Sequence, residues 1–596
     1  MPKKELEKLA GKTEEHEFYT PIPDGYVKGK TKYVIVTGTV MSGLGKGIFS
    51  SSLSKLLENN GFACMPIKME GYLNLDSGTL NPYRHGEVFV LDDGTECDMD
   101  LGTYERMMDK NLTRQCFITN GQIFNKIFER ERRGEYLGRD VQFIPHVTGE
   151  VKRHLRELAM NSNADIVLVE VGGTMGDIEN SHYIEALREL NYEEGNDNVC
   201  FVALTYVLEP GFLGEQKSKA AQLGIRLLME KGIQPKIIAC RAEHPITEKV
   251  KEKISIYTNV PVERVFSMHD VDSIYLIPKM MREEKLDQEV LKILKLDNKA
   301  KATASGGVPP TIWSSDIGGG KIKAPKGSLR EKNEEWDEFT QKVLKKKKNK
   351  ITVGIAGKYT GLRDSYASII KALEHCGAQL NTDIDIHWIE TTKIEEKDKE
   401  AIAELKKIDA LIVPGGFGKR GTEGKIECVK FARENRIPYL GLCLGFQIAL
   451  IEFARNVCHL KNANSTEMNN KTPHPVVAIL PSQKKIDKLG GSMRLGGRDI
   501  DVKKDSMAYK LYGNKTSIRE RFRHRYECNP KYIQKFEENG IIFSGKAPGE
   551  NIMQILELKN HPYFIASQFH PEFTSRPLAP NPLFKGLVEA AIKLKK

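Results

Sequence analysis

The stretch Gly441-Leu442-Cys443-Leu444-Gly445-Phe446-Gln447 decides the fold of the C-terminal part of this chain. Pro438–Leu440 is typical of the end of a buried strand, and Ile448 begins an apolar-periodic helix predicted to run to about Asn456. A cysteine between two glycines at a strand-to-helix junction is the thiol form of a nucleophile elbow. The glycines permit the sharp turn because a Cβ would clash there. The turn lifts the sulfur above the sheet, and the helix N-terminus favours the reactive thiolate.

Cysteine is among the most buried residue types, so most intracellular cysteines are small core residues. We interpret the other nine in this way: Cys64, Cys97, Cys116, Cys200, Cys240, Cys376, Cys428, Cys458 and Cys528. Cys443 differs because Ser567-Gln568-Phe569-His570-Pro571-Glu572 follows an apolar strand, Tyr563–Ala566. The imidazole of His570 can accept the thiol proton, and the carboxylate of Glu572 can fix its tautomer. These three residues predict a catalytic triad.

With Pro414-Gly415-Gly416-Phe417-Gly418 upstream, residues 350–596 resemble the class I glutamine amidotransferases. The resemblance implies that Cys443 attacks the side-chain amide of glutamine, forms a glutamyl thioester and releases ammonia. His570 would act as base and then as acid, with Glu572 orienting it. Backbone N–H groups near Gly416 and Leu444 would stabilise the oxyanion. The implied glutamine-binding residues are Gly416, Leu444, Gly445, Phe446, Gln447, Glu467 and Arg525.

Within that set, Arg525 can pair bidentately with the α-carboxylate of glutamine, and Glu467 can neutralise its ammonium. An ammonia source implies a consumer, which the other half of the chain should contain.

The length and composition limit the class of protein. A chain of 596 residues is too long for one core and predicts two to four domains. No apolar run of 18 residues and no signal pattern are found, so neither a membrane nor a secreted protein is expected. Ten cysteines without paired spacing indicate a reducing compartment, by default the cytosol. Much of the net charge of +10 lies in Lys345–Lys348 and the C-terminal lysines, so nucleic-acid binding is not expected.

The N-terminal half carries a second strand-to-helix junction. A buried strand, Lys32–Thr37, leads into the glycine-rich loop Gly38–Gly47, and a helix is predicted from Ile48 to Asn60. Backbone N–H groups and a helix N-terminus in such an arrangement cradle phosphate, and Lys46 would reach the terminal phosphates. A plain glycine-rich turn is the alternative, because the match to the standard P-loop is imperfect.

Two departures from the P-loop have a consequence for metal binding. Val40 stands where the first glycine is expected, and Gly47 replaces the Ser/Thr that holds magnesium. Any magnesium ligands must therefore come from carboxylates elsewhere. Asp100 follows a predicted strand, and Glu170 closes the apolar strand that starts at Asp165. Both are expected at the carboxyl edge of a parallel sheet, where ligands bind.

The alternative for Asp100 is a turn or helix-capping role. Glu170 is harder to explain without a partner, because burying an acid in an apolar strand is costly.

Residues 31–300 resemble the synthetase domain of the CTP synthase family. The matching runs are Ser42–Gly47, His85–Val90, Asp98–Arg106, Glu170–Thr174, Gly176–Glu179 and Gly214–Lys217. Together with the amidotransferase, the resemblance covers nearly the whole chain beyond residue 30. It implies ATP-dependent amination of UTP to CTP through a 4-phosphorylated intermediate, with ammonia from glutamine passing along a closed path.

The resemblance also implies the fold. It predicts two doubly wound α/β domains with mostly parallel sheets: a P-loop-like, dethiobiotin-synthetase-like synthetase domain and a flavodoxin-like amidotransferase domain. The expected boundaries are an N-terminal extension over 1–30, the synthetase domain over 31–300, a linker over 301–349 and the amidotransferase domain over 350–596.

Carried over residue by residue, the resemblance implies three sets of ligands. ATP would contact Gly43, Leu44, Gly45, Lys46, Gly47, Ile48, Asp100, His269, Asp270 and Val271, with Lys68 near phosphate. UTP or inhibitory CTP would contact Ser42, Asp177, Ile178, Glu179, Lys217, Ser218, Lys219, Ala220, Ala221, Gln222 and Lys253. Mg²⁺ would be held by Asp100 and Glu170.

Three segments depart from the family pattern. Lys217-Ser218-Lys219-Ala220-Ala221-Gln222 stands where Lys-Thr-Lys-Pro-Thr-Gln is usual, Glu70-Gly71-Tyr72 where Asp-Pro-Tyr is expected, and Asn180-Ser181-His182 is likewise unusual. Both lysines and the glutamine of the first segment remain, so phosphate contacts are expected to persist. We expect the departures to affect the tightness of pyrimidine binding more than the reaction.

The family further implies regulation and assembly. Lys419–Lys425 is a basic loop beside the oxyanion glycines, in which Arg420 is a candidate contact for the allosteric activator GTP; a solvated loop is the alternative. CTP feedback inhibition, a cytoplasmic homotetramer and filaments are also implied. Two other functions stay open: a divergent copy acting mainly as a filament scaffold, and another amidoligase such as a corrinoid amidase. The basic segment Lys217–Gln222 argues against the second.

Overall fold

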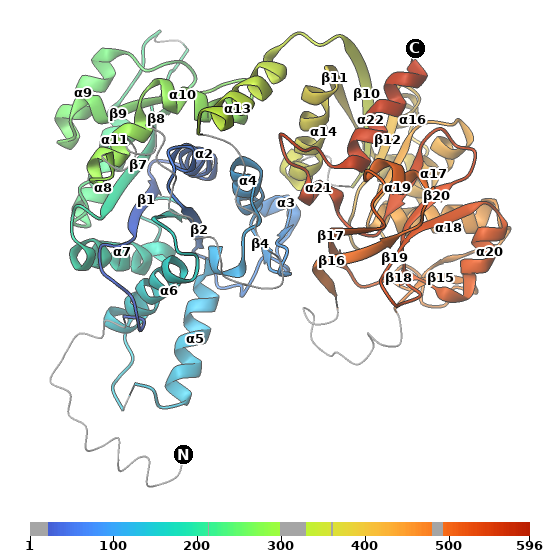
Figure 1. Cartoon of the computed structure of the whole chain (residues 1–596), viewed down its shortest axis with the longest axis horizontal. Helices are drawn as coiled ribbons and strands as arrows, with labels where there is room; N and C mark the ends of the chain where they lie inside the picture. Colours follow the sequence, from blue (N-terminus) through green and yellow to red (C-terminus); the bar gives the residue numbers. More distant parts are fainter. Residues whose placement is uncertain are drawn as a thin grey trace. The chain divides into compact units, whose positions relative to one another are not determined.

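The computed structural model describes residues 22–136, 138–211, 214–297, 329–358, 362–479 and 493–595. The chain divides into two compact units (Figure 1). Unit 1 comprises Met1–Asp76 and Thr103–Asp337, and unit 2 comprises Ser77–Gly102 and Glu338–Lys596. The segment Ser77–Gly102, which we call the strap, therefore belongs with the C-terminal part of the chain. Most of the expected N-terminal extension, and residues 301–328 of the expected linker, lie outside the described residues.

The described part of unit 1 contains one parallel sheet of seven strands in the order β5-β2-β6-β1-β7-β8-β9. The strands are β1 (Lys32–Gly38), β2 (Cys64–Glu70), β5 (Phe117–Thr119), β6 (Ile166–Val171), β7 (Val199–Tyr206), β8 (Ile237–Ala242) and β9 (Val265–His269). All six neighbouring pairs are parallel. Because β1 and β6 are parallel neighbours, the loops that follow these two strands lie at the same edge of the sheet.

Helices cover both faces of this sheet (Figure 1). On one face α2 (Lys46–Asn59) packs against α10 (Ile277–Glu283) and α11 (Leu286–Ile293), and on the other α6 (Thr148–Asn161) packs against α7 (Ser181–Glu194). The remaining long helices are α5 (Asn120–Arg132), α8 (Lys219–Glu230) and α9 (Glu248–Thr258). The doubly wound arrangement predicted for this domain is confirmed. Helix α2 begins two residues earlier than the predicted Ile48, so Lys46 is its first residue.

Unit 2 is built on a nine-stranded sheet with the order β11-β10-β12-β13-β21-β20-β19-β16-β17 among the described residues. The parallel half is β11 (Thr382–Glu390), β10 (Asn349–Gly357), β12 (Ala410–Val413), β13 (Tyr439–Leu442) and β21 (Phe564–Ser567). The antiparallel half is β20 (Met553–Leu558), β19 (Ile541–Lys546), β16 (Arg494–Val502) and β17 (Ser517–His524). The parallel half agrees with the flavodoxin-like domain that was predicted, and the antiparallel half extends it.

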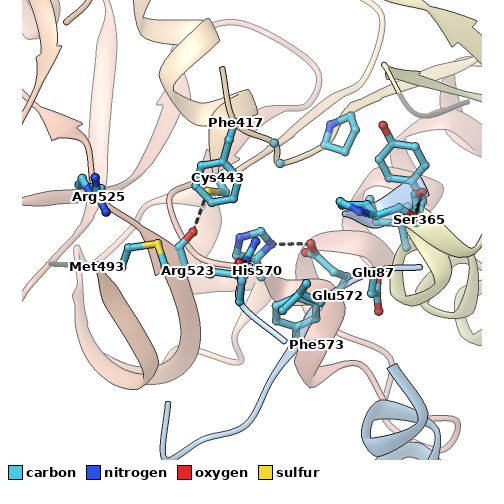
Figure 2. A pocket seen from close by; sticks show the side chains of 18 of the residues that line it. Glu87, Ser365, Phe417, Cys443, Met493, Arg523, Arg525, His570, Glu572 and Phe573 are labelled. Atoms are coloured by element: carbon cyan, nitrogen blue, oxygen red, sulfur yellow. Dashed lines mark hydrogen bonds and ion pairs between the residues drawn. The ribbon is translucent and has the colours of Figure 1, made fainter. Parts of the chain in front are cut away.

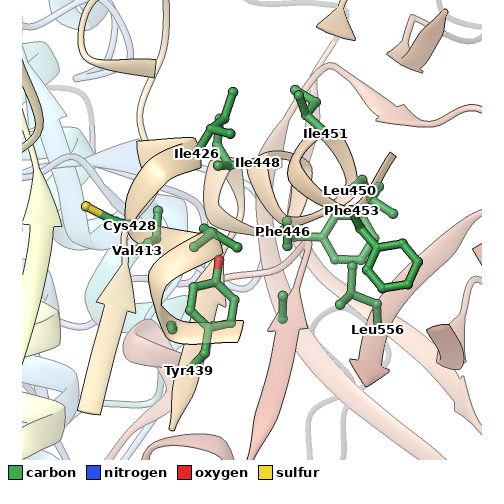
Figure 3. Close-up of a cluster of buried hydrophobic side chains, with 14 of the residues drawn as sticks. Val413, Ile426, Cys428, Tyr439, Phe446, Ile448, Leu450, Ile451, Phe453 and Leu556 are labelled. Atoms are coloured by element: carbon green, nitrogen blue, oxygen red, sulfur yellow. The ribbon is translucent and has the colours of Figure 1, made fainter. Parts of the chain in front are cut away.

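Alternating residues of the parallel strands fill two separate cores. Ala410 and Ile412 of β12 face α14 (Ala367–Gln379) and α22 (Pro582–Lys595). Leu411 and Val413 face the opposite cluster, which includes Phe446, Ile448 and Leu450 of α18 (Leu444–Asn456) and residues of α17 (Thr422–Glu434) (Figure 3). Helix α18 is therefore buried on most sides. This packing fixes the start of the helix, directly after Cys443.

The strap forms a short hairpin against β17. Strands β3 (Phe89–Val90) and β4 (Glu96–Cys97) pair antiparallel, and α4 (Met99–Met108) follows. Three alternate residues of β17, all arginines, donate hydrogen bonds to the strap. Arg519 Nη2 donates to Asp92 Oδ2 at 2.9 Å, and Arg521 Nη1 donates to the carbonyl of Val90 at 3.1 Å. Arg523 Nε donates to Glu96 Oε1 at 2.7 Å. Residues two apart on a strand share one face, so the three arginines form a row that holds the strap.

Two further points complete the fold. Helix α13 (Leu329–Leu344) occupies part of the segment expected to be a linker, and its Trp336 Nε1 donates to the carbonyl of Tyr275 in unit 1 at 3.1 Å. Among the described residues, no helix is both long and apolar enough to cross a bilayer.

Candidate active site

Cys443 is the single residue between β13 and α18. Its backbone has φ 50° and ψ −96°, a conformation that non-glycine residues adopt only when the surroundings enforce it. The flanking glycines provide those surroundings through close packing. A Cβ on Gly445 would lie 2.1 Å from the carbonyl oxygen of Val413, and one on Gly441 would lie 2.6 Å from the hydroxyl of Tyr439. The sharp strand-to-helix turn at Cys443, with a clash at both flanking glycines, is therefore present as predicted, and the nucleophilic role of Cys443 stays a prediction.

His570 and Glu572 follow β21, the strand next to β13. His570 Nδ1 and Glu572 Oε1 are 2.7 Å apart, and both side chains are buried (Figure 2). The other ring nitrogen, Nε2, has no hydrogen-bond partner among the described residues. Burial lowers the pKa of His570, but Glu572 and Cys443 raise it more, so that the pKa is about 10. The imidazolium form is therefore stabilised between a carboxylate and the thiol.

The glycine-rich loop Pro414–Gly418, which we call the oxyanion loop after its predicted role, follows β12, on the other side of β13. A Cβ on Gly415 would lie 2.9 Å from His570 Cε1 and 3.6 Å from Cys443 Cβ, so both side chains converge on this glycine. Gly418 N donates to Glu467 Oε1 at 2.7 Å. Three neighbouring parallel strands thus deliver the loop, the thiol and the imidazole to one edge of the sheet.

These residues line a cavity of about 370 Å³ (Figure 2). Of the predicted glutamine-binding residues, Gly416, Glu467 and Arg525 line it, together with Cys443 and the triad acid and base. The other predicted residues, Leu444, Gly445, Phe446 and Gln447, do not line the cavity and lie in the first turn of α18. The Oε1 atom of buried Gln447 has no hydrogen-bond partner among the described residues, while its Nε2 donates to the carbonyl of Tyr526 at 3.0 Å.

The strap supplies one wall of the cavity. Gly78, Leu80, Pro82, Glu87 and Val88 line it. Phe89 of the strap packs edge-on against Phe573 with ring centroids 4.9 Å apart, and Phe573 in turn stacks on His570, also at 4.9 Å. A segment from the N-terminal half of the sequence therefore supports the imidazole, which no local pattern in the sequence could have indicated.

Two other neighbours of the thiol escaped the sequence analysis. The Sγ of Cys443 is 3.6 Å from the carbonyl of Arg523 (Figure 2). Gln568 Nε2 lies 3.8 Å from the same sulfur. Gln568 is part of the quoted Ser567–Glu572 motif, so its position was available. Arg523 could have been noticed only from the alternation of arginines at 519, 521 and 523.

The glycine-rich loop of unit 1 runs from Gly38 to the start of α2. Gly45 caps the helix with φ 82°, and Lys46 Nζ donates to the carbonyl of Gly173 at 2.7 Å. Val40 has φ 70°, although a β-branched side chain strongly disfavours this region. The loop thus keeps the left-handed backbone at the position of the missing P-loop glycine. Leu44, Gly47 and Ile48 lie in the loop end and the first turn of α2, as predicted for phosphate contacts.

Arg241 links this loop to the predicted adenine contacts. Its Nη1 donates to the carbonyl of Gly43 at 2.7 Å and its Nε to Asp270 Oδ1 at 3.0 Å. His269, Asp270 and Val271 lie at or just beyond the end of β9. Arg241 is the penultimate residue of β8 and was missed, because a lone arginine near a strand end carries no distinctive pattern.

The residues predicted for the pyrimidine lie around the same edge of unit 1. The carboxylate of Asp177 accepts hydrogen bonds from Thr174 N at 2.6 Å and Thr174 Oγ1 at 2.9 Å, whereas Ile178 is 81% exposed beside Glu179. Lys219, Ala220, Ala221 and Gln222 begin α8, preceded by Lys217 and Ser218; Ser42 and Lys253 are exposed. A Cβ on Gly224 of α8 would lie 2.8 Å from Thr39 Cβ, so this helix packs directly on the glycine loop.

Two of the departures from the family pattern compensate for each other. A Cβ on Gly71 would lie 2.4 Å from Asn180 Oδ1, and Asn180 Nδ2 donates to the carbonyl of Gly172 at 2.8 Å. The small residue at 71 thus leaves room for the unusual asparagine at 180. His182 is buried among aromatic rings, and burial lowers its pKa to about 4.

The two predicted metal ligands have different settings. Glu170 is buried near the end of β6, where Oε1 accepts from Lys68 Nζ at 2.6 Å and Oε2 from the hydroxyl of Tyr104 at 3.1 Å. Asp100 was predicted to follow a parallel strand, and this prediction is wrong. It lies in the first turn of α4 after the antiparallel hairpin strand β4, and its backbone N–H donates to Asp98 Oδ1.

Asp100 belongs to unit 2 and Glu170 to unit 1. Within the described residues, no cluster of three or more His, Cys, Asp or Glu has the geometry to hold a metal ion by itself.

The predicted C-terminal boundary of the basic loop Lys419–Lys425 is wrong. Helix α17 begins at Thr422, so Lys425 lies in its first turn and is buried. Arg420 Nη2 donates to the carbonyl of Lys358 at 2.8 Å and to the hydroxyl of Tyr83 in the strap at 3.2 Å.

Comparisons with known proteins agree with both halves of the chain. A family model described as CTP synthase N-terminus matches residues 32–296, and one described as glutamine amidotransferase class-I matches residues 362–590. The CTP synthases of Pyrococcus abyssi and Pyrococcus furiosus are 47% and 46% identical over 566 residues, covering 95% of this chain and 98% of each relative. The glutaminase domain of Trypanosoma brucei CTPS, solved with bound acivicin, is 36% identical over 41% of this chain and 94% of its own length, with a TM-score of 0.39. The chain therefore belongs to the CTP synthase family, glutamine-hydrolysing carbon–nitrogen ligases.

Proposed function

We propose that this chain aminates UTP to CTP, using ammonia that a Cys443–His570–Glu572 triad releases from glutamine and a 4-phosphorylated UTP formed with ATP. The observation that carries the proposal is the elbow itself. Cys443 stands alone between β13 and α18 in a strained conformation, next to an imidazole whose other nitrogen is held by a buried carboxylate. Strain of this kind is retained where a side chain must be presented for chemistry.

In the glutaminase half, the thiolate of Cys443 attacks the amide carbon of glutamine. N–H groups of Gly416 and Leu444 receive the developing oxyanion, an interaction worth about 3 kcal/mol for each donor. His570 then gives its proton to the departing ammonia, and water later attacks the thioester. Arg525 and Glu467, which line the cavity, bind the two charged groups of glutamine, and Leu444–Gln447 form the first turn of the helix directly after the nucleophile.

In the synthetase half, the loop Gly43–Gly47 and the N-terminus of α2 bind the phosphates of ATP. Lys46 leaves the carbonyl of Gly173 to reach the terminal phosphates, and Arg241 holds the loop against Asp270 near adenine. Asp177–Glu179, Lys217–Gln222, Ser42 and Lys253 bind the pyrimidine nucleotide. Phosphorylation at carbon 4 of the ring creates the leaving group that ammonia displaces.

We assign Mg²⁺ to Glu170 and Asp100, together with the phosphates. Glu170 fits this role because its buried carboxylate lies near the end of β6 and is already paired with the cation of Lys68. Bound magnesium would neutralise phosphate oxygens during transfer. In this assignment the ammonium group of Lys68 would leave Glu170 and contact phosphate once Mg²⁺ is bound to the Glu170 carboxylate.

Regulation and assembly follow from family membership. We propose GTP activation through Arg420, CTP feedback at the pyrimidine site, and a cytoplasmic homotetramer that can form filaments. The domain boundaries we assign are 31–300 for the synthetase and 350–596 for the glutaminase, with the strap as the synthetase segment that supports the second site.

The test is an assay that follows all reactants together. Purified protein with UTP, ATP, Mg²⁺ and glutamine is expected to form CTP, ADP, phosphate and glutamate in equal amounts. Glutamate without CTP would indicate a different acceptor, such as the acid of a corrinoid amidase. Polymer without turnover under saturating substrates would support the scaffold function instead.

A further inference from the structure

Lys425 is a buried cation that the triad chemistry does not use. Helix α17 begins directly after Gly421, which has a left-handed backbone at the N-cap. Lys425 lies in the first turn of this helix and is 1% exposed. Burying an ammonium group is unfavourable unless it is paired or hydrogen-bonded, so a lysine at such a position needs a reason. The sequence analysis included it only as the last residue of the basic loop Lys419–Lys425 and gave it no role of its own.

The side chain reaches the back of the oxyanion loop. Lys425 Nζ donates to the carbonyl of Pro414 at 3.1 Å, the one side-chain hydrogen bond that the described residues give it. A Cβ on Gly416 would lie 3.9 Å from the same nitrogen. Because a trans peptide points its C=O and N–H in opposite directions, this contact directs the N–H of Gly415 away from Lys425.

Lys358 holds the next part of the same loop. Its Nζ donates to the carbonyl of Phe417, and the N–H of that peptide, on Gly418, donates to Glu467. Lys358 is also buried. Two lysines thus bind two carbonyls of the oxyanion loop.

The charge of Lys425 is coupled to the nucleophile. Burial, together with nearby Lys358, lowers the pKa of Lys425 to about 7, although Cys443, Cys428 and Glu390 act in the opposite direction. A negative charge on the Cys443 sulfur therefore favours protonated Lys425. By reciprocity, protonated Lys425 favours the thiolate.

We propose that Lys425 is a positioning residue of the glutaminase: it fixes the Pro414–Gly415 peptide of the oxyanion loop and supplies the positive charge that stabilises the Cys443 thiolate and the oxyanion that replaces it. The inference rests on the proposed glutaminase function. It explains why an ammonium group is retained at a fully buried position, since functional sites accept groups that lower stability.

Replacing Lys425 with methionine removes the charge and the donor but keeps an unbranched side chain. We expect Lys425→Met to lower kcat for glutamine hydrolysis about 10- to 100-fold, because the oxyanion donors are misplaced rather than deleted. KM for glutamine should stay within about twofold, as Arg525 and Glu467 are untouched. The melting temperature should not fall, because a buried ammonium is replaced by an apolar group.

One further measurement and two further variants separate a positioning role of Lys425 from a role in folding. Alkylation of Cys443 by iodoacetamide at neutral pH should be slower in Lys425→Met, since it reports the thiolate directly. Lys430→Met, on the same helix, should match the wild type in every assay. Lys425→Gln, which keeps a donor but no charge, should show the slower alkylation with a smaller loss of kcat.

The outcomes are decisive in either direction. Unchanged kcat and alkylation in Lys425→Met, with wild-type protein active and Cys443→Ala inactive, would overturn the role of Lys425 and leave the proposed function intact. Wild-type protein without glutaminase activity would instead refute the proposed function. A lower melting temperature together with loss of ammonia-driven synthesis would show that Lys425 serves folding, and if Lys425→Met does not fold, the same criteria apply to Lys425→Gln.

Discussion

The molecule contains two strand-to-helix junctions that solve opposite problems. In unit 1, residues 39–45 separate β1 from α2, a loop long enough to present several backbone N–H groups. In unit 2, Cys443 alone separates β13 from α18. Each junction forces one non-glycine residue into a positive φ, Val40 at 70° and Cys443 at 50°.

The difference lies in what the strain achieves. A phosphate cradle uses N–H groups, so the side chain at the strained position is irrelevant and a glycine would serve as well. A nucleophile elbow uses the side chain itself, so the strained residue cannot be exchanged. We therefore expect substitutions at Val40 to be mild and substitutions at Cys443 to be severe, with the two activities separable.

The largest effect is expected at the elbow. Cys443→Ala should reduce glutamine-driven CTP synthesis by at least about 10⁴-fold, because no other group can form the thioester. Synthesis from added ammonia should stay within about twofold of wild type. Cys458→Ala, a buried cysteine of the same unit, is the matched control and should retain both activities. Loss of both activities in Cys443→Ala would refute separate sites.

The next effect sharpens the comparison from the side of unit 1. Glu170→Ala should lower both glutamine-driven and ammonia-driven synthesis about 10³-fold, since both require the phosphorylated pyrimidine. Glutamate release by the untouched triad serves as the control for folding. Glu170→Gln keeps the volume and one acceptor and should lose the same activity. Ammonia-driven turnover at the wild-type rate would overturn the assignment of Glu170 to the metal.

A smaller effect concerns the imidazole. Because the pKa of His570 is raised to about 10, its proton is available to the leaving ammonia at lower pH and is lost as the pH rises through that value. Glutaminase kcat/KM should therefore fall on a basic limb near pH 10. Glu572→Gln removes the carboxylate charge, so the limb should move to lower pH and kcat should fall about 10²-fold.

The check is the pH dependence of glutaminase kcat/KM, measured from pH 6 to 11 in the wild type and in Glu572→Gln. If the basic limb lies at the same pH in both proteins, Glu572 does not raise the pKa of His570.

The smallest effect tests the strain at Val40. Glycine at this position relieves a left-handed conformation worth about 1–2 kcal/mol but adds about 0.5–1 kcal/mol of unfolded-state entropy. Val40→Gly should therefore change the free energy of unfolding by no more than about 1 kcal/mol and keep activity. Val262→Gly, equally exposed but without a positive φ, should lose about 0.5–1 kcal/mol in the same denaturation experiment. Equal losses at both sites would contradict the strain.

Local patterns were enough to predict much of this molecule. The elbow, the His-Pro-Glu motif and the glycine loop each combine residues that are close in sequence with a strand-to-helix junction. Their positions follow from the hydrophobic strands beside them. The order of the strands then brings Gly416, Cys443 and His570 together, because β12, β13 and β21 are neighbours.

What could not be predicted depends on contacts between distant segments. The strap joins the C-terminal unit through Arg519, Arg521 and Arg523, although it lies more than 400 residues earlier in the chain. Asp100 was placed on a parallel strand because a short hairpin strand looks the same in sequence. Lys425 was taken for a loop residue because its neighbours Gly421 and Gly424 resemble a turn, whereas a Cβ on Gly424 would lie 1.8 Å from the carbonyl of Thr391, so that glycine serves close helix packing.

The most direct test of the account follows the nitrogen atom. Wild-type protein supplied with UTP, ATP, Mg²⁺, amide-¹⁵N glutamine and an equal concentration of unlabelled ammonium should form CTP labelled with ¹⁵N, one for each glutamate released. Cys443→Ala should form unlabelled CTP under the same conditions. Unlabelled CTP from the wild type, or labelled CTP from Cys443→Ala, would contradict the transfer of nitrogen from the thiol site to the phosphorylated pyrimidine.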